Sequence, residues 1–458
     1  MMKYDAIIIG FGKGGKTMAG ALAGQGKKVA LIEKDSKMYG GTCINVGCIP
    51  SKSLVRSAHL SDLNGGGFDE KSRRFKAAIA EKVRLTDMLR GKNYAKLADH
   101  PNVTVYDGEG SFVSQNQVKV HTDNGDTILE GDKIFINTGS TSFVPPIQGI
   151  KGNPFVYTSE GMLSLEKLPK HLVIIGGGYI GLEFASMYTG FGSEVTVIQV
   201  EDTFIPREDR DIADAIQAVF EKRGVKFVFS ASTTAIENDG KTAQVHYTVA
   251  GKETVLEADA VLIATGRKPN VAGLNVEEAG VELTDRGAIK VDEYLKTTAP
   301  NIWAMGDVAG GLQFTYVSLD DYRIVLPQVY GTATRSTAKR SNVPYSVFIA
   351  PAFSRVGLNE EEAKAAGYNY VVAKMPAAAV PKAQVQKVPE GLLKAIVDAD
   401  TGKILGAMLF CEESYEVINI VKLAMDMGAD YTVLRDQIYT HPTMSEALND
   451  LFGMIKLG

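Results

Sequence analysis

Residues 4–33 have the sequence YDAIIIGFGKGGKTMAGALAGQGKKVALIE, which carries the most structural information in the chain. The apolar, β-branched run at residues 4–9 predicts a buried strand, and residues 10–15 then form a GxGxxG motif. We expect a helix at residues 16–25 and a second strand at residues 28–32. That strand ends at Glu33, 23 residues after Gly10. A strand, a glycine-rich turn, a helix, a strand and an acid in this order predict a dinucleotide-binding unit.

The same unit occurs a second time. Residues 171–175 are expected to form a strand, residues 176–181 the glycine-rich turn, residues 182–190 a helix and residues 194–198 a strand. Gln199 follows Gly176 by 23 residues, the spacing of Glu33 from Gly10. Each unit is followed by an apolar run that ends in Thr-Gly. A single GxGxxG is a weak signal, but two copies in matching context predict an α/β chain with two Rossmann-like domains.

Each glycine and each residue after the second strand has an expected part in cofactor binding. The first glycine permits the tight turn, the second lets the backbone approach a pyrophosphate, and the third lets the helix pack closely on the strand. Glu33 can accept hydrogen bonds from a ribose, whereas neutral Gln199 leaves NADH and NADPH open. The positions assigned to cofactor binding in the two units are Gly10, Gly12, Gly15, Glu33, Gly176, Gly178, Tyr179, Ile180, Gly181 and Gln199.

Composition restricts the class of protein. The chain has 458 residues, about three domains' worth, with 45% hydrophobic and 22% charged residues. A net charge of -5 argues against a nucleic-acid or membrane-surface partner. Three cysteines do not form a secreted disulfide framework, and the first apolar run is too short for a signal peptide. We therefore expect a cytoplasmic protein.

The pattern changes after about residue 345. Strands are predicted at residues 394–398 and 404–410, and helices at residues 416–427 and 445–456. This pattern predicts a separate α+β domain without a phosphate loop. The Gly-rich and charged residues 64–76 are expected to form an exposed loop or a ragged helix start.

Cys43 and Cys48 lie five residues apart in the segment GGTCINVGCIPSK. In a regular helix that spacing is a rise of about 7.5 Å, whereas a disulfide needs Cα atoms within about 4.4–6.8 Å. The pair can close only if the helix is distorted, for which Gly47 supplies freedom. We expect a reducible bond with one thiol near a helix N-terminus, where its pKa falls. A zinc half-site or two inert thiols are the alternatives; we assign no metal site, and Cys411 is expected to be buried.

His441 and Glu446 lie five residues apart ahead of a predicted helix. A carboxylate at that distance can fix the tautomer of an imidazole and support its charged form. Taken alone, the pair is more typical of a capping histidine with an acid at the helix start.

At this point the sequence resembles the flavoprotein disulfide reductases, the class that contains dihydrolipoamide dehydrogenase, glutathione reductase and mercuric reductase. The resemblance runs through nearly the whole chain. Its motifs are the two GxGxxG turns, GTC-x4-C at residues 41–48, ATGRxPN at residues 264–270, MGD at residues 305–307 and HP-x3-E at residues 441–446. The resemblance implies a glutathione-reductase-like fold. Its parts would be an FAD-binding domain at residues 1–149, an NAD(P)H-binding domain at 150–271, a part completing the FAD domain at 272–343, and an α+β dimerisation domain at 344–458.

The resemblance also implies roles for single residues. Cys48 would be the charge-transfer thiol against the flavin, and Cys43 the interchange thiol that attacks substrate. Lys52, paired with Glu183, would lie near the flavin N5, and Asp307 at its ribityl chain. His441, with Glu446, would be the acid–base group, supplied by the other subunit of a homodimer. Further cofactor-binding positions implied are Gly41, Thr42, Lys52, Gly110, Thr138, Gly139, Gly266, Arg267 and Thr315.

Departures from the family pattern indicate which branch of the family the sequence resembles. Residues 313–317, QFTYV, are similar to the mercuric reductases, but the last fifteen residues hold no cysteine to deliver mercuric ion. The segments GFGK at 10–13, MYGGTCIN at 38–45, PREDRD at 206–211, SLDDYRIV at 318–325 and LRDQ at 434–437 resemble the RclA-type branch, reductases of bacterial defence against reactive chlorine species. That branch is associated with reduction of hypothiocyanous acid and of Cu(II).

The hypothesis from sequence is an FAD-dependent, NAD(P)H-consuming reductase that uses Cys43 and Cys48 to reduce a small oxidant. Hypothiocyanous acid or a related reactive chlorine or thiol oxidant is the expected substrate. Three alternatives stay open: dihydrolipoamide dehydrogenase, direct reduction of Cu(II), mercuric ion or oxygen by the flavin, and a redox sensor that changes partners when the cysteine pair opens.

Overall fold

The first predicted unit is the centre of a seven-stranded sheet in the computed structural model, which describes residues 2–457. The strand order is β3-β2-β1-β6-β5-β4, and β17 pairs with β6 in parallel. Strand β1 pairs in parallel with β2 and β6, and Ile7 and Ile8 on it are fully buried. The strands are β1 (Met2–Ile9), β2 (Val29–Glu33), β3 (Val103–Asp107), β4 (Glu109–Ser114), β5 (Gln117–Thr122), β6 (Gly125–Ile136) and β17 (Ile302–Ala304).

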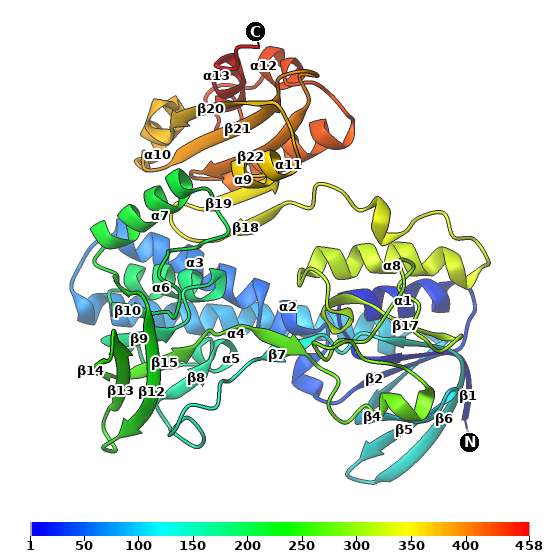
Figure 1. Ribbon diagram of the computed structural model, residues 1–458. Helices are drawn as coiled ribbons and strands as arrows, with labels where there is room; N and C mark the ends of the chain where they lie inside the picture. Colours follow the sequence, from blue (N-terminus) through cyan, green and yellow to red (C-terminus); the bar gives the residue numbers. More distant parts are fainter. Residues whose placement is uncertain (1, 458) are drawn as a thin grey trace.

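Helices from distant parts of the chain pack together next to this sheet. Helix α1 (Lys13–Gly24) follows the first glycine-rich turn and packs against α8 (Thr315–Val329), which comes from much later in the chain. Helix α3 (Cys48–Leu63) runs from α2 (Thr42–Asn45) toward the second unit, and α4 (Phe68–Ala98) packs on α3 and returns to the first sheet at β3 (Figure 1).

The second predicted unit forms a five-stranded parallel sheet in the order β11-β10-β9-β15-β8. A three-stranded antiparallel sheet, β12-β13-β14, packs beside it around Val173, Ile236 and Val245. The elements are β8 (Val156–Thr158), α5 (Ser159–Met162), β9 (His171–Ile175), α6 (Tyr179–Gly190), β10 (Glu194–Ile198), α7 (Arg210–Lys222), β11 (Lys226–Val228), β12 (Ala231–Asn238), β13 (Ala243–Val249), β14 (Lys252–Ala258) and β15 (Ala260–Ile263). A short ribbon of β7 (Ser140–Ser142) and β16 (Arg267–Pro269) joins the two units.

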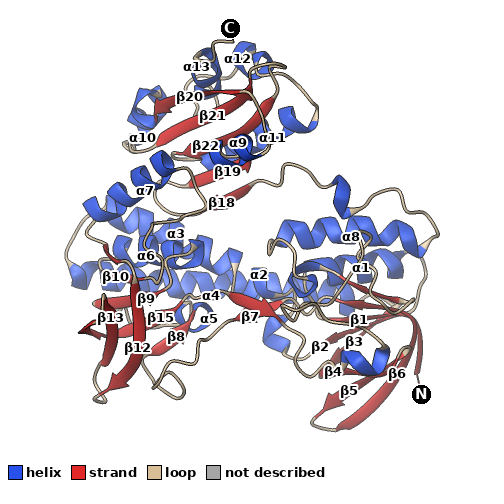
Figure 2. Ribbon diagram, viewed as in Figure 1, coloured by secondary structure: helices blue, strands red, loops and turns tan. Residues whose placement is uncertain are grey.

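The C-terminal part is an antiparallel sheet in the order β18-β19-β22-β21-β20, with helices around it (Figure 2). It lies above the second unit in Figure 1, next to α7. Its elements are β18 (Tyr345–Val347), β19 (Phe353–Gly357), α9 (Glu360–Ala365), β20 (Tyr370–Pro376), α10 (Pro381–Gln386), β21 (Leu392–Asp398), β22 (Ile404–Phe410), α11 (Ser414–Asp426), α12 (Thr432–Asp436) and α13 (Ala447–Gly453).

The fold confirms most predicted elements and corrects one. Strands β9, β10 and β22 have the predicted bounds, and the α+β pattern after residue 345 is confirmed. The expectation of a loop or ragged helix at residues 64–76 is wrong beyond Gly67, because α4 begins at Phe68 and continues for 31 residues. The Glu70 side chain accepts the Gly67 amide, which caps this helix start and stabilises it. Among residues 2–457, no helix has the length and apolar character of a membrane span.

Candidate active site at the cysteine pair

The two cysteines lie on separate short and long helices, with a break between them where the spacing predicts a distorted helix. Cys43 is in α2, Cys48 is the first residue of α3, and residues 46 and 47 interrupt the helix between them. Both are free thiols, Cys43 half-buried and Cys48 exposed. The expectation of a distorted helix and of one thiol at a helix N-terminus is therefore confirmed. Cys411 is buried in the C-terminal core, also as predicted.

The two thiols have opposite protonation preferences. The Cys43 thiol donates a hydrogen bond to the Cys48 sulfur, and this bond is the largest cause that lowers the pKa of Cys48 to about 6. The Thr315 hydroxyl, 3.5 Å from the Cys48 sulfur, and the charge of Lys52 lower that pKa further. The same hydrogen bond, with burial, raises the pKa of Cys43. Cys48 is therefore the thiolate of the reduced pair, and Cys43 holds the proton.

Lys52 and Glu183 form an ion pair that joins α3 to α6. The Lys52 Nζ atom is 2.9 and 2.7 Å from the two carboxylate oxygens of Glu183. The Phe348 amide donates to Glu183 at 3.0 Å, and the Phe348 ring covers the ammonium at 4.6 Å. Three segments from distant parts of the sequence therefore hold this pair beside the cysteines.

The first glycine-rich turn fits a dinucleotide. Gly10 has a φ of +102°, and a Cβ atom there would lie 2.4 Å from the Asn137 carbonyl oxygen, so no other residue fits without distortion. The N-cap residue of α1 is Gly12, which has no side chain, and the side chains of Ser318 and Asn137 accept the Gly14 and Gly15 amides of the first turn at 3.1 and 2.9 Å. The positive end of the helix dipole at Gly12 suits a phosphate. Gly15, where a Cβ would lie 2.5 Å from the Gly10 carbonyl, confirms the close packing expected of the third glycine. At the end of β2 the Glu33 carboxylate accepts the Phe11 amide at 3.1 Å, and burial raises its pKa.

The second turn has the same construction. Gly178 precedes α6, which also lacks a capping side chain, and the space around it is open. Gln199 is buried and donates to the Thr203 carbonyl at 2.9 Å. Ile180 is exposed in the first turn of α6, whereas the Tyr179 hydroxyl donates to Glu208.

The remaining predicted positions lie where the ribbon β7–β16 meets the first sheet and α2. The Ser140 hydroxyl donates to Asp307 at 2.6 Å and accepts from Arg267 at 2.8 Å. The Thr138 hydroxyl donates to the Asn270 carbonyl at 2.7 Å. The others occupy turns or tightly packed backbone: Gly139 and Gly266 have positive φ, Gly41 packs on Gly12, Thr42 opens α2 and Gly110 packs on Ile9 and Ile32.

His441 and Glu446 are brought together, apart from the cysteines of the same chain. The His441 Nδ1 atom lies 2.7 Å from a Glu446 carboxylate oxygen, and the imidazole is exposed. Glu446 immediately precedes α13, at the end of the C-terminal part far from α2 (Figure 1). Glu446 therefore orients an imidazole that is exposed on the surface of the chain.

A cluster of carboxylates elsewhere has a lysine as its partner. Asp209, Asp211 and Glu360 bring oxygen atoms within 4.8 Å of one another. The fully buried ammonium of Lys394 lies among them, 2.6 Å from Asp209 and 3.0 Å from Asp211. These charges form an ion-pair network between α7 and the C-terminal sheet.

Several residues that build the site were assigned no role from sequence. Asn137 accepts the Gly15 amide at 2.9 Å and donates to the Met305 carbonyl at 2.6 Å, which ties α1 to β17. Ser318 and Glu208 lie in two segments that the RclA-type resemblance singled out, and that was the available signal. Ser140 and Phe348 lie in no motif, so only the folded chain shows their contacts.

Comparison with known proteins identifies relatives across the whole chain. Residues 4–321 match the family described as pyridine nucleotide-disulphide oxidoreductase, and residues 343–452 match its dimerisation domain. The "probable pyridine nucleotide-disulfide oxidoreductase RclA" of Escherichia coli is 51% identical over 456 residues, which cover 100% of both chains. A mercuric reductase of Bacillus cereus is 36% identical over 451 residues, which cover 97% of this chain and 70% of the relative. The solved Cu(II) complex of the HOCl-induced flavoprotein disulfide reductase RclA from Escherichia coli has a TM-score of 0.94, with 51% identity and 100% coverage of both chains.

The chain belongs to the pyridine nucleotide-disulphide oxidoreductase family. It is a flavoprotein disulfide reductase similar to RclA, and its cofactors are FAD and a pyridine nucleotide. The dimerisation domain supports a homodimer. Helices α1 and α6 each begin directly after a glycine turn, and their N-termini fit one dinucleotide apiece.

Proposed function

We propose that this enzyme uses NAD(P)H to reduce a small oxidant at Cys43 and Cys48, with hypothiocyanous acid as the substrate and related reactive chlorine or thiol oxidants as further substrates. The observation that carries the proposal is the thiol pair at the break between α2 and α3, in which Cys43 holds a proton and Cys48 is a thiolate. A small oxidant needs only access and a nucleophilic sulfur. The description of the similar solved structure as HOCl-induced agrees with an oxidant as substrate. We place the enzyme in the cytoplasm, where NAD(P)H is available.

The first unit would hold FAD at the N-terminus of α1, with Glu33 on the ribose and Asp307 on the ribityl chain. The second unit would hold NAD(P)H at the N-terminus of α6, with Gln199 at the adenosine end. Bound FAD supplies the transfer of two electrons from NAD(P)H to the cysteine pair. The ion pair of Lys52 and Glu183, already covered by the Phe348 ring, keeps a positive charge next to the Cys48 thiolate.

The chain's own thiols then perform the reduction. The Cys43 sulfur attacks the sulfur of hypothiocyanous acid, a Cys43–S–SCN bond forms, and the hydroxyl group leaves as water with the thiol proton. We assign the transfer of that proton to His441 of the partner subunit, oriented by Glu446. The Cys48 thiolate then attacks the Cys43 sulfur, the disulfide forms, and thiocyanate leaves. The sum is NADH and hypothiocyanous acid going to NAD⁺, thiocyanate and water.

The test is stopped-flow NAD(P)H consumption by the FAD-loaded protein with hypothiocyanous acid, wild type beside Cys43→Ser and a Cys411→Ser control. We expect rapid turnover in the wild type and in Cys411→Ser, whose thiol is buried away from the site. Cys43→Ser should lose turnover while NAD(P)H still reduces its flavin. Slow turnover in all three proteins would eliminate this substrate.

Reduction of Cu(II) is the second candidate, because the similar solved structure is a Cu(II) complex. The same three proteins distinguish it. A Cys43→Ser variant that keeps full Cu(II)-dependent NAD(P)H consumption would show that the flavin reduces the metal directly. Turnover with NAD and dihydrolipoamide would instead favour dihydrolipoamide dehydrogenase.

A further inference from the structure

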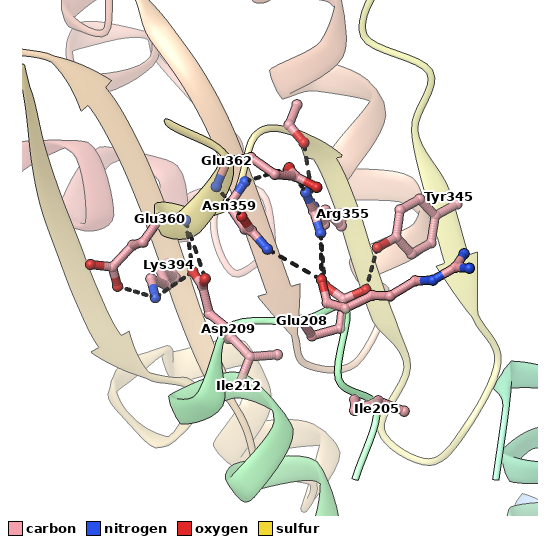
Figure 3. Close-up of polar contacts among 12 residues, drawn as sticks. Ile205, Glu208, Asp209, Ile212, Tyr345, Arg355, Asn359, Glu360, Glu362 and Lys394 are labelled. Atoms are coloured by element: carbon pink, nitrogen blue, oxygen red, sulfur yellow. Dashed lines mark hydrogen bonds and ion pairs between the residues drawn. The ribbon is translucent and has the colours of Figure 1, made fainter. Parts of the chain in front are cut away.

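Glu208 is a buried carboxylate to which the reaction above gives no role. Its side chain has no exposed surface, and it lies in the PREDRD segment ahead of α7. The hydroxyls of Tyr179 and Tyr345 both donate to one of its oxygens. Arg355 lies 3.3 Å from the other oxygen, and Figure 3 shows the contacts of Tyr345 and Arg355. A buried charge needs such partners, so the two hydroxyls are held firmly.

The loop that carries Glu208 is fixed to the C-terminal sheet. Arg355 and Asn359 both donate to the Arg207 carbonyl, at 3.1 and 3.2 Å. The Glu360 amide donates to Asp209 at 3.1 Å (Figure 3). Glu208 therefore stands on a rigid seam between the second unit and the C-terminal part.

Tyr179 connects this seam to the glycine turn that would bind NAD(P)H. It is the first residue of α6, directly after Gly178 and one helical turn before Glu183. Its ring stacks on the Tyr345 ring at a centroid distance of 5.6 Å and an angle of 29°. Burial and the charge of Glu208 raise the pKa of both tyrosines, so both hydroxyls stay protonated and donate.

The row of rings continues toward the cysteines. Phe314 is nearly parallel to Tyr345 at 6.4 Å, and Tyr316 stacks on Phe314 at 5.0 Å. Thr315, between these two rings in sequence, is the residue in contact with the Cys48 sulfur. The rings therefore form one wall from the turn of α6 to the thiol pair.

We propose that Glu208 is a positioning residue that fixes the rings of Tyr179 and Tyr345 beside the path of the nicotinamide. This inference rests on the proposed binding of NAD(P)H at α6. A tyrosine that is already held loses no side-chain entropy when the dinucleotide binds, so the tether increases affinity for the reductant. It also keeps the aromatic wall aligned while the hydride is delivered. The thiol reaction with the oxidant does not involve Glu208.

The test compares FAD-loaded Glu208→Gln with the wild type in two measurements. The first is the dissociation constant of NAD⁺ by isothermal titration, which needs no turnover, and the second is stopped-flow flavin reduction by NADH. The amide would point donor hydrogens at Arg355, and its oxygen accepts more weakly than a carboxylate. We expect binding weaker by about fivefold to tenfold, and flavin reduction slower to a similar degree. Reoxidation of the pre-reduced enzyme by the oxidant should stay within about twofold.

Matched variants isolate the tether. Glu362→Gln removes the other carboxylate of Arg355 without touching either tyrosine, and it should match the wild type. Tyr179→Phe keeps the ring and removes its hydrogen bond to Glu208, so it should show the same weaker binding and slower flavin reduction as Glu208→Gln. It replaces Glu208→Gln in the test if that variant does not fold. If Glu208→Gln and Tyr179→Phe both bind NAD⁺ with wild-type affinity and show the wild-type rate of flavin reduction, the inference is overturned. If neither NADH nor NADPH reduces the flavin of the wild-type enzyme, the proposed function is overturned instead.

Discussion

The protonation of the thiol pair can be tested by a pH titration of the half-reduced enzyme. A thiolate beside oxidised flavin gives a long-wavelength charge-transfer absorbance, whereas a thiol does not. The pKa of Cys48 lies at about 6, below the roughly 8.5 of a free cysteine. The thiolate is therefore the form above pH 6, about nine-tenths of the population at pH 7, and it is lost as the pH falls through 6. Anaerobic addition of one equivalent of NADH, followed by titration, measures the midpoint.

Two variants assign the cause of that shift. The hydrogen bond from Cys43 is the largest contribution, so Cys43→Ala should raise the midpoint most. This variant has no disulfide to open, so it is titrated with its flavin oxidised and without NADH. Thr315→Ala removes the hydroxyl 3.5 Å from the Cys48 sulfur and should raise the midpoint by less. Cys411→Ser, in the core of the C-terminal part, should leave the midpoint unchanged. A wild-type midpoint near that of a free thiol would refute the reasoning, as would a midpoint that Cys43→Ala does not move.

Three further predictions follow from other parts of the structure. Glu446→Gln should slow turnover at least about tenfold, because His441 loses its orienting carboxylate, while stopped-flow reduction of the flavin stays unchanged; equal slowing of both would contradict this. Lys394→Met should cost about 3–5 kcal/mol of unfolding free energy at pH 7, measured by denaturant titration, because it removes the ion-pair partner of the buried Asp209 carboxylate and leaves Asp211 and Glu360 with Lys374 alone. Burial alone would raise the pKa of Asp211, but bonds from Lys374 and Lys394 hold that pKa below its ordinary value. The loss of unfolding free energy in Lys394→Met should therefore become smaller as acid protonates the carboxylates. A loss that does not change with pH would exclude unpaired carboxylates as its cause. Gln199→Glu should lower kcat/KM for NADPH relative to NADH at least about tenfold by charge repulsion, and an unchanged ratio would place the 2′-phosphate elsewhere.

Local patterns predicted the sheet elements well, and helix starts less well. Strands such as β9 and β10 have the predicted bounds because a buried parallel strand is a short apolar run between turns. Helix α1 begins at Lys13, three residues before the predicted start, and so includes Gly14 and Gly15 in spite of their low helix propensity. Gly15 is nevertheless required there, since a side chain would meet the Gly10 carbonyl. Packing between the helix and the turn outweighs propensity at this position.

In the candidate site, too, local sequence patterns predicted some features, and contacts between distant residues decide the others. The spacing of Cys43 and Cys48 was enough to predict a helix break and a thiol at a helix N-terminus. The contact of Thr315 with Cys48 joins residues 267 positions apart, and no local pattern reports such a distance. The pairing of Lys52 with Glu183 was available only through the family resemblance, since it spans 131 residues.

The buried charges around Glu208 are better explained by geometry than by stability. A buried ion pair can often be replaced by apolar side chains without loss of stability, because desolvation offsets the attraction. Arg355 already has Glu362 as a second carboxylate, so Glu208 is not needed to neutralise it. What Glu208 alone provides is one oxygen on which the hydroxyls of Tyr179 and Tyr345 converge. An apolar core at this seam would pack the same rings but would leave their orientation unspecified, and orientation is what a hydride-transfer site requires.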